Sequence, residues 1–423
     1  MLENFDLKLL VEPLQNWFLE HKRVLPWREH PTGYYVWISE IMLQQTRVEA
    51  VKPYFDRFIK ELPTIEALAN CPEDKLLKLW EGLGYYNRVR NLKVAANQIL
   101  EEYDGIMPSE YEDLIKLKGI GSYTAGAISS IAFGKPVPAV DGNVLRVISR
   151  VTADDSDIMK QSVRKNMEHH LLTLMRKQSV DLNEEIKKQA TSEECVSEIG
   201  IVVPQIFNQA LMELGAMVCV PNGAPHCEVC PWKDLCEAKK QDRIGELPVK
   251  KKAKERRIEQ KTVLIIKDGE QVALHKRPKK GLLAGLYELP NTEGYLSEEE
   301  VTQYIREQGY EPVRIQKACD AKHIFSHVEW HMKGYVVFLQ AKEYESDIRK
   351  RDISDKNTVD MANSKRIVIN EKTVLDSVKQ EKSNKNNWIF VDVDETRQQY
   401  AIPSAFVKYA EYLNLVLGKN AII

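Results

Sequence analysis

Four cysteines near the middle of the 423-residue chain have the spacing of a metal centre. They are Cys219, Cys227, Cys230 and Cys236, and the last three read C-x2-C-x5-C. Four thiolates of this kind hold either a tetrahedral zinc ion or an iron–sulfur cluster. His226 stands directly before Cys227 and offers an alternative site of three cysteines and one histidine. The cysteines therefore predict a metal centre, and thiolates alone do not decide which metal it holds.

Two glycines upstream, Gly119 and Gly121, bracket Ile120 between two helical runs. Such a turn exposes consecutive N–H groups at the start of the second helix, where a phosphate can bind. Glycines also join many helix pairs that bind nothing, so both interpretations stay open. Asp141 follows in an Asp-Gly-Asn turn that begins another helix. It is a candidate catalytic carboxylate or a simple N-cap.

The elements that must position these residues are helical in the first part of the chain. Apolar residues recur there three and four positions apart, which is the period of an amphipathic helix. The runs that predict helices are Leu7–Phe18, Trp37–Leu43, Ala50–Ile59, Asp74–Trp80, Val89–Leu100 and Val144–Val151. We therefore expect a mainly α domain over residues 1–237, with a polar insertion at about 177–197.

The pattern changes after a basic segment at residues 238–258. Lys261–Arg277 reads as strand, Asp-Gly turn and strand, and alternation returns in Lys333–Ala341 and Trp388–Val393. Helices are expected at Ser297–Gln308 and Pro403–Leu417. We therefore predict a second, α+β domain over residues 259–423, with a polar insertion at about 343–387.

Composition narrows the function only slightly. The net charge of −2 neither favours nor excludes DNA binding, which requires a local basic face. Ala238–Lys261 carries ten Lys or Arg against four Asp or Glu, and is either a solvated linker or one that contacts phosphates. No apolar run reaches the roughly 18 residues of a membrane-spanning helix. The acidic N-terminus does not have the pattern of an export signal.

Further motifs occur in a fixed order along the chain. They are LPWR at Leu25–Arg28, WISEIMLQQT at Trp37–Thr46, WEGLGYY at Trp80–Tyr86 and NQALMELGA at Asn208–Ala216. Together with the hairpin, Asp141 and the cysteines, they resemble the helix-hairpin-helix DNA glycosylases, and within these the MutY family of adenine glycosylases. The resemblance implies an α-helical glycosylase domain with a [4Fe–4S] cluster loop and a C-terminal α+β Nudix-like domain.

The same resemblance implies different catalytic roles for two carboxylates. Departure of adenine requires a general acid and a group that stabilises the oxocarbenium-like sugar. Glu40 is expected to protonate adenine N7, while Asp141 stays ionised beside the sugar. Tyr123 stands where bifunctional relatives carry a lysine, so we expect a monofunctional enzyme in which Tyr123 hydrogen-bonds near Asp141. Asn143 is expected to position Asp141 or water.

Residues for DNA and base recognition are also implied. Base flipping needs side chains that fill the vacated stack, and Gln45 and Tyr85 are expected in that role. The residues expected around the adenine pocket are Trp27, Arg28, Leu43 and Gln209. Gly119 and Gly121 are expected to contact the DNA backbone.

The cysteine spacing departs from the family pattern in one place. MutY-like enzymes space their ligands C-x6-C-x2-C-x5-C, whereas Cys219 and Cys227 are separated by seven residues. One additional loop residue accounts for this and leaves Cys227 as the second ligand of a [4Fe–4S] cluster. A site that uses His226 with three cysteines, and zinc in place of the cluster, remain alternatives.

In the C-terminal part, the segments Lys276–Pro290 and Phe325–His331 resemble the MutY Nudix-like domain. Phe325, Ser326 and His327 are expected to form the loop that reads 8-oxoguanine, whose N7–H is a donor where guanine has an acceptor. No Nudix metal-binding helix pattern follows Gly285, so no pyrophosphatase activity is expected.

Three other functions were weighed against this hypothesis. An endonuclease III-like enzyme for oxidised pyrimidines is disfavoured by Tyr123, and a non-catalytic DNA-binding repair module by the presence of both Glu40 and Asp141. An active Nudix hydrolase lacks its metal box. The expected partner is duplex DNA containing 8-oxoguanine:A or G:A pairs. We expect a monomer in the bacterial cytoplasm, associated with the nucleoid.

Overall fold

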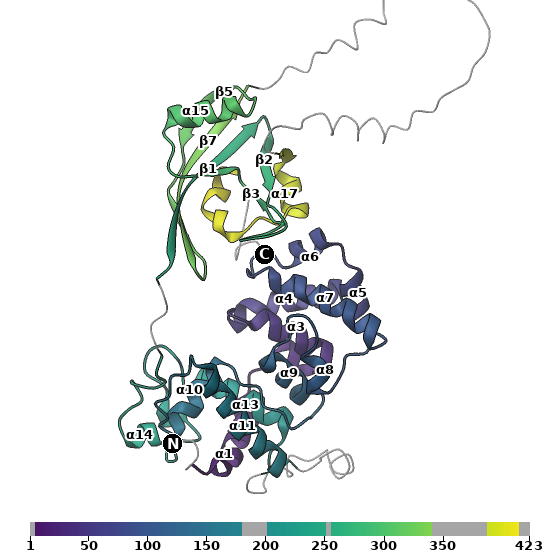
Figure 1. The fold of residues 1–423 in the computed structure, drawn as a ribbon, viewed down its shortest axis with the longest axis vertical. Coiled ribbons are helices and arrows are strands. Elements are labelled where there is room, and N and C mark those ends of the chain that lie inside the picture. The colour runs from purple at the N-terminus through teal and green to yellow at the C-terminus, as the bar shows by residue number, and fades with distance from the viewer. Residues whose placement is uncertain (1–4, 180–200, 251–254, 341–386, 414–423) are drawn as a thin grey trace, which may run out of the picture. The chain divides into compact units, whose positions relative to one another are not determined.

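The computed structural model describes residues 5–179, 201–250, 255–340 and 387–413. The chain divides into two compact units, Met1–Lys254 and Glu255–Ile423 (Figure 1). The cut between them lies within the basic segment 238–258, in which Ala238 and Leu247 are buried against Ala153 of the first unit. Most of the two predicted insertions, 177–197 and 343–387, lies outside the described residues.

The described part of the first unit is helical, as the periodicity predicts. Its α-helices are α1 Val11–His21, α2 Pro26–Glu29, α3 Gly33–Leu43, α4 Val48–Glu61, α5 Ile65–Asn70, α6 Glu73–Leu79, α7 Asn87–Glu102, α8 Tyr111–Leu114, α9 Ser122–Ala127, α10 Gly142–Val151, α11 Gln161–Gln178, α13 Pro204–Met217 and α14 Glu237–Lys240. Short 3-10 turns occupy Leu7–Leu10 and Cys227–Val229, and a π-helical turn, Ile128–Ala132, extends α9.

Two helices of the first unit are buried on nearly all sides. In α10 every residue from Val144 to Val151 is buried, including Arg146 and Arg150, and the helix packs against α13. In α3 nine of the eleven residues are buried, among them Glu40. A helix enclosed in this way cannot shift its side chains without disturbing its neighbours. Both carboxylates of interest are therefore placed by rigid parts of the fold.

The glycine-rich hairpin joins α8 to α9. Leu117 and Ile120 are buried beneath it. Gly119 has a φ of 79°, and a Cβ there would lie 2.6 Å from the Cβ of Asn91, so both conformation and space require glycine. Gly121 is the N-cap of α9 and its α-carbon faces open space. The backbone at the start of α9 is therefore open to a ligand.

The second unit contains an eight-stranded mixed sheet. Its elements are β1 Arg257–Asp268, β2 Gln271–Lys276, β3 Tyr287–Glu288, β4 Asn291–Glu293, α15 Glu298–Glu307, β5 Pro312–Lys317, β6 Ala321–Ile324, β7 Val328–Leu339, β8 Trp388–Asp392, α17 Val393–Gln399 and a 3-10 segment, η7, at Ser404–Leu413. The main strand order is β3-β2-β1-β7-β5. The central pair, β1 and β7, is parallel and the other pairs are antiparallel.

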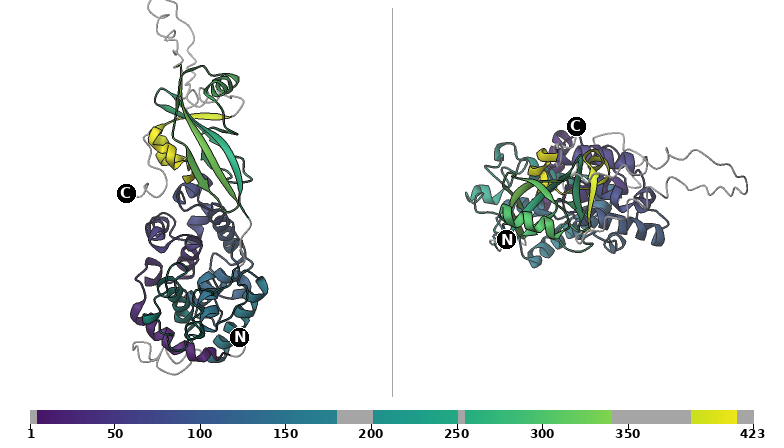
Figure 2. Two further views of the ribbon diagram at one scale, coloured as in Figure 1. Left: turned by 90° about the vertical axis from the view of Figure 1, so that its left-hand side faces the viewer. Right: turned by 90° about the horizontal axis from the view of Figure 1, so that it is seen from above.

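Alternate residues of β1 point to opposite faces of this sheet. Val263 and Ile265 pack in the core that contains Phe406 of η7, whereas Leu264 and Ile266 pack in a second core with α15. Figure 2 shows these helical segments on the two sides of the strands. A strand with apolar residues on both faces is expected in the middle of a three-layer arrangement. The unit is therefore a sheet covered on both faces.

The predicted strands and the helix at Ser297–Gln308 are confirmed with small shifts at their ends. The helix predicted for Pro403–Leu417 is confirmed over the residues that the structure describes, as a 3-10 helix. The segment is 3-10 over Ser404–Leu413, where the N–H of Phe406 donates to the carbonyl of Pro403 three residues earlier, and the remainder lies outside the described residues.

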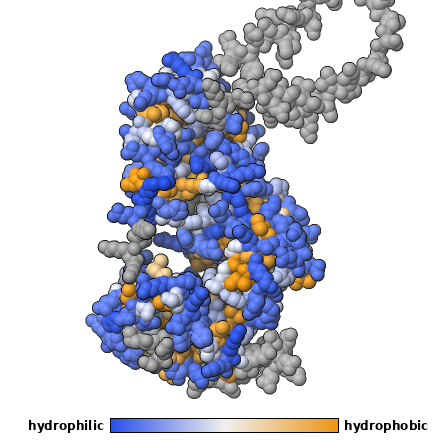
Figure 3. All heavy atoms as spheres, viewed as in Figure 1, coloured by the Kyte–Doolittle hydropathy of each residue, from blue (hydrophilic) through white to orange (hydrophobic). Residues whose placement is uncertain are grey.

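On the face drawn in Figure 3, hydrophilic side chains dominate and hydrophobic ones occur in small groups. Within the described ranges, no helix has the length and apolar character needed to cross a membrane.

Candidate active site

A cavity of about 920 Å³ opens in the first unit, and most of the residues predicted for catalysis and adenine binding line it. These lining residues come from α2, α3, α9, α10 and α13 and from the loops beside them. They are Trp27, Arg28, Glu40, Leu43, Gln45, Tyr123, Asp141, Asn143 and Gln209. Residues more than a hundred positions apart in the sequence therefore meet at one site.

Glu40 is only 7% exposed on the inner side of α3. Burial raises the pKa of its carboxyl to about 7, and the charge of Asp141 adds to this rise, while the hydrogen bond from Tyr123 and the charge of Arg28 oppose it. A carboxyl with this pKa carries a proton in a large fraction of molecules at neutral pH. Glu40 is thus suited to act as a general acid.

Tyr123 forms its hydrogen bond inside the cavity. Its hydroxyl donates to Oε2 of Glu40, and the sulfur of Met212 lies 3.1 Å away. Tyr123 also interacts electrostatically with Asp141, near which its hydrogen bond was expected, but the acceptor is Glu40. Because Tyr123 is buried and its neighbours are carboxylates, its own pKa lies well above the usual value, so the phenol remains a donor.

Asp141 caps the N-terminus of α10. Its Oδ1 accepts the backbone N–H of Val144 at 2.8 Å, and its Oδ2 accepts Nδ2 of Asn143 at 2.7 Å. The pKa of this carboxyl is raised overall, because burial outweighs these hydrogen bonds and the charge of Arg146, which lower it. The donors all stabilise the ionised form. Asp141 is therefore the N-cap of α10, as one interpretation of the sequence predicted, and its catalytic role stays a prediction.

The two carboxyl groups thus have different surroundings within one cavity. The carboxyl of Glu40 receives a hydrogen bond from one phenol, while that of Asp141 receives hydrogen bonds from a backbone amide and a side-chain amide at a helix N-terminus. Hydrogen bonds of this kind favour the anion at Asp141, so Glu40 is the candidate acid and Asp141 the candidate anion. The arrangement can protonate a leaving group and stabilise a cation formed beside it.

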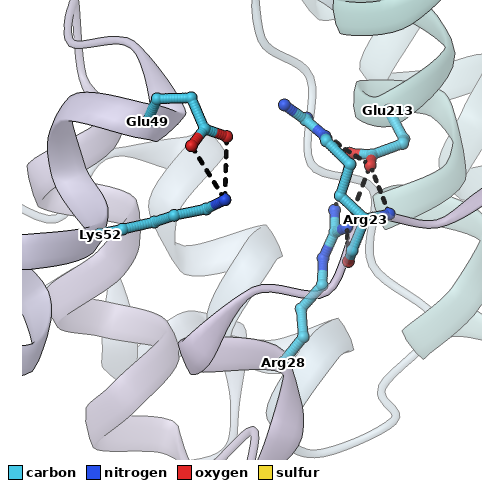
Figure 4. Close-up of polar contacts among 5 residues, drawn as sticks. All are labelled: Arg23, Arg28, Glu49, Lys52 and Glu213. Carbon is cyan, nitrogen blue, oxygen red and sulfur yellow. Dashed lines mark hydrogen bonds and ion pairs between the residues drawn. The ribbon is translucent and has the colours of Figure 1, made fainter.

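A third carboxylate, Glu213 of α13, was not predicted as part of the site. Its side chain is held between Arg23 and Arg28, with N···O distances of 2.8 and 2.9 Å (Figure 4). Burial alone would raise the pKa of Glu213, but the hydrogen bonds from both arginines outweigh it and lower the pKa to about 2. Glu213 therefore remains ionised and fixes Arg28 at the wall of the cavity.

One signal in the sequence points to this ion pair. Glu213 is the single charged residue in the apolar helical run FNQALMELGAMV, and a buried carboxylate requires a partner. Arg23 and Arg28 flank a short turn that contains Pro26. Nothing in the sequence indicates that these distant segments meet. Arg164, which also lines the cavity and donates to the carbonyl of Val140, was likewise missed.

The remaining pocket residues are held at its wall. Trp27 is buried edge-on against Phe55, with ring centroids 5.4 Å apart. Leu43, the last residue of α3, lines the cavity beside Glu40. Nε2 of Gln209 donates to the carbonyl of Gln205 at 2.7 Å, one turn earlier in α13. Polar and charged side chains outnumber the apolar ones around the cavity, and the apolar part of the wall includes Leu25, Val36 and Ile131.

Gln45 and Tyr85 share an unusual backbone conformation. Their φ angles are 57° and 49°, in the left-handed region that residues other than glycine rarely adopt. Gln45 lies at the rim of the cavity, and Tyr85 is 49% exposed on the loop after α6 but does not line the cavity. Strain of this kind in two neighbouring loops marks a functional surface when surrounding contacts maintain it.

The four cysteines lie on one loop that follows α13. Burial raises the pKa of Cys230 to about 12, and the neighbouring Cys219, Cys236 and Cys227 add to that rise. Nη1 of Arg150 lies 3.3 Å from the sulfur of Cys219. Thiols whose pKa is raised become thiolates when a positive metal centre binds them, so cysteines are chemically able to hold a metal here and the centre stays a prediction. Over the described ranges, no three Cys, His, Asp or Glu side chains are arranged to hold a single metal ion.

In the second unit, Phe325, Ser326 and His327 form the turn between β6 and β7. The ring of Phe325 packs between His323 and Trp330, at centroid distances of 4.6 and 4.9 Å. Ser326 and His327 are exposed. The hairpin is therefore anchored by an aromatic side chain and presents two polar ones at its tip.

Comparison with known proteins agrees with this fold. Residues 38–171 match the HhH-GPD superfamily of base excision DNA repair proteins, and residues 262–412 match the NUDIX domain. The first unit is thus a helix-hairpin-helix glycosylase domain and the second a Nudix-like domain. The chain is 32% identical to the adenine DNA glycosylase of Buchnera aphidicola subsp. Baizongia pistaciae over 78% of its own length and 86% of that protein. It is 33% identical to the mouse adenine DNA glycosylase over 79% and 71%, respectively. The chain belongs to the adenine DNA glycosylase family.

Proposed function

We propose that this adenine DNA glycosylase hydrolyses the N-glycosidic bond of adenine paired with 8-oxoguanine or guanine in duplex DNA. The observation that carries the proposal is the pair of carboxyls in one cavity, with the pKa of Glu40 raised to about 7 and Asp141 held by hydrogen bonds from Val144 and Asn143. The cavity of about 920 Å³ has room for an extruded adenine nucleotide.

The reaction begins with the proton of Glu40. The carboxyl transfers it to N7 of adenine, the C1′–N9 bond breaks, and its electron pair leaves with the base. Asp141 stabilises the positive charge that develops on the sugar. Water then adds to C1′ and gives up one proton, which restores the acid form of Glu40. The products are free adenine and an abasic site. Tyr123 orients the Glu40 carboxyl through its hydrogen bond, and Asn143 does the same for Asp141.

The enzyme is proposed to stop at the abasic site. Cleavage of the strand by a glycosylase requires an amine that forms an imine with the sugar. The described residues that line the cavity include no lysine, and the phenol of Tyr123 cannot form an imine. This supports a monofunctional glycosylase and disfavours an endonuclease III-like reaction.

Recognition of the opposite base is assigned to the β6–β7 hairpin. The exposed hydroxyl of Ser326 can accept the N7–H of 8-oxoguanine, a donor that guanine does not have. Phe325 and His327 would support this contact from either side. Gln45 and Tyr85 are proposed to fill the stack vacated by adenine, and the start of α9 with Gly119 and Gly121 to bind a DNA phosphate.

The cysteine loop is proposed to hold a [4Fe–4S] cluster through Cys219, Cys227, Cys230 and Cys236. When bound, the cluster would cross-link this loop. Arg150 already connects the loop to α10 through the Cys219 sulfur and the carbonyl of Val220. Iron and acid-labile sulfide content per chain would test this assignment. Zinc without iron would instead support a zinc site made of the four cysteines, or of three cysteines and His226.

The substrate assignment is tested by single-turnover base release. Duplexes containing 8-oxoguanine:A, G:A and thymine glycol are incubated with excess enzyme, and both free base and strand breaks are measured. We expect adenine release from the first two duplexes, with strands that break only after alkali treatment. Strand cleavage at thymine glycol without adenine release would favour an endonuclease III-like enzyme. Binding without any base release would indicate a non-catalytic repair module.

A further inference from the structure

The guanidinium of Arg88, in the first turn of α7, donates to five backbone carbonyl oxygens in two separate segments. Nη1 reaches the oxygens of Ile41, Met42 and Gln44 at 2.7, 3.1 and 2.7 Å, and Nη2 reaches those of Leu83 and Gly84 at 2.9 and 3.1 Å. One side chain thus joins the end of α3 to the loop that follows α6.

Each of these segments leads directly into a residue with a left-handed backbone. Gln44 precedes Gln45, whose φ is 57°, and Gly84 precedes Tyr85, whose φ is 49°. Such conformations cost about 1–3 kcal/mol each and persist only where surrounding contacts enforce them. The hydrogen bonds of Arg88 end at the residue before each strained position. Arg88 is therefore placed to enforce both conformations at once.

The last backbone carbonyl groups of α3 also need hydrogen-bond donors. The last carbonyls of a helix have no partner within the helix, and the helix dipole makes this end attractive to a cation. Ile41 and Met42 belong to the last turn of α3, which carries Glu40. Arg88 binds their carbonyls and so fixes the end of the helix that positions the proposed acid.

Arg88 achieves this without an acidic partner. Over the described residues, no carboxylate forms an ion pair with it, and its guanidinium instead lies 5.4 Å from the Trp80 ring centroid and 5.6 Å from that of Tyr85. Burial lowers its pKa to about 10, so it stays charged at neutral pH. The guanidinium of Arg88 is planar, so the directions of its N–H groups are fixed. Its hydrogen bonds therefore orient the backbone carbonyl groups that accept them.

We propose that Arg88 is a positioning residue for base extrusion, which holds Gln45 and Tyr85 together in the conformation that fills the stack left by adenine. This inference rests on the proposed function, because it requires Gln45 and Tyr85 to act on DNA. It adds to that function a residue that touches neither the base nor the reacting atoms.

The first test replaces the planar guanidinium of Arg88 but keeps its positive charge. In Arg88→Lys, one ammonium group cannot span both segments, so the single-turnover rate of adenine release from an 8-oxoguanine:A duplex should fall about 10- to 100-fold, as expected for a displaced reaction geometry. Arg90→Lys is the matched control, since Arg90 lies on the same helix and pairs with Glu73. The control should retain the wild-type rate. A wild-type rate in Arg88→Lys would overturn the proposal.

The second test separates positioning from general loss of folding. Arg88→Lys is combined with Gln45→Ala and Tyr85→Ala, and its effect on the rate is compared with that in the wild-type background. If Arg88 acts through these two side chains, Arg88→Lys should lower the rate of adenine release by less than about threefold once they are absent. An equal loss in both backgrounds would mean that Arg88 acts through stability or through the end of α3 and not through Gln45 and Tyr85, and would contradict the proposal.

A third measurement excludes direct contact with DNA. The affinity of Arg88→Gln for a duplex with a non-hydrolysable adenine analogue opposite 8-oxoguanine is measured against salt concentration. Positioning predicts weaker binding with an unchanged salt slope, whereas loss of a phosphate contact would lower the slope by about 0.9 and contradict the proposal.

If the wild-type protein releases no adenine, the proposed function fails. If it does, and Gln45→Ala with Tyr85→Ala leaves the rate unchanged, the Arg88 proposal fails alone.

Discussion

The catalytic cavity of the first unit and the β6–β7 hairpin of the second differ in how they expose their functional groups. In the cavity, Glu40 is almost fully buried and its pKa is raised to about 7. At the hairpin, Ser326 and His327 are exposed at the tip of a turn anchored by Phe325. Burial changes the proton affinity of a group, whereas an exposed group can be reached by a partner. The chemistry and the recognition therefore require opposite environments.

Removing either cavity carboxylate should have the largest effect. Asp141→Asn removes the negative charge that stabilises the sugar cation, and we expect the single-turnover rate to fall by at least about 10³-fold. Glu40→Gln removes the acid and should cost about 10²–10⁴-fold. Both variants should still bind the duplex, as a gel-shift titration would reveal. Near-wild-type turnover in either variant would remove that residue from the chemistry.

Glu213 lines the same cavity as Glu40 and Asp141, but its ion pair predicts an effect on stability. Glu213→Ala leaves Arg23 and Arg28 without their partner, and breaking such a buried ion pair should lower the free energy of unfolding by about 3–5 kcal/mol. Because the folded-state pKa of Glu213 is lowered to about 2, its stabilisation is present above the unfolded value near 4.5 and is lost as the pH falls toward 2. Denaturant melts at pH 7 and pH 3 would measure this. Equal losses at both pH values would contradict the linkage.

Glu40 should have the opposite effect on stability. Its folded-state pKa, about 7, is above that of an unfolded carboxyl, so ionising it in the cavity destabilises the protein as the pH rises from about 4.5 to 7. Glu40→Gln should therefore unfold at a higher temperature than the wild type at pH 8, and at nearly the same temperature at pH 4. A calorimetric scan at each pH compares the two proteins. No gain at pH 8 would indicate that the carboxylate is not desolvated.

The hairpin should have the smallest effect. Ser326→Ala removes one hydrogen-bond acceptor for the N7–H of 8-oxoguanine. Loss of this hydrogen bond should cost about 1–3 kcal/mol, which is roughly 5- to 150-fold in the preference for 8-oxoguanine:A over G:A. The rate on 8-oxoguanine:A should fall toward that on G:A, while the rate on G:A stays unchanged. An equal loss on both duplexes would mean that Ser326 supports the fold and does not read the base.

Sequence reasoning succeeded where a local pattern has one physical meaning. The helices, the central strands and the glycine at position 119 follow from periodicity and from a turn that excludes a Cβ. The prediction failed where distant segments meet. The partner of Tyr123 is Glu40, and the ion pair of Glu213 joins α13 to the loop before α2. The carbonyls bound by Arg88 belong to the end of α3 and to the loop after α6. Only the folded backbone determines these pairings.

The central claim is that Glu40 acts as an acid while Asp141 remains an anion in the same cavity. The most direct test is the pH dependence of single-turnover adenine release by the wild-type protein and by Glu40→Gln. The account predicts that the wild-type rate falls about tenfold per pH unit above a pH near 7, where Glu40 loses its proton, and that this alkaline limb is absent from the residual rate of Glu40→Gln. A wild-type rate that rises with pH through 7 would contradict the assignment of Glu40 as the acid.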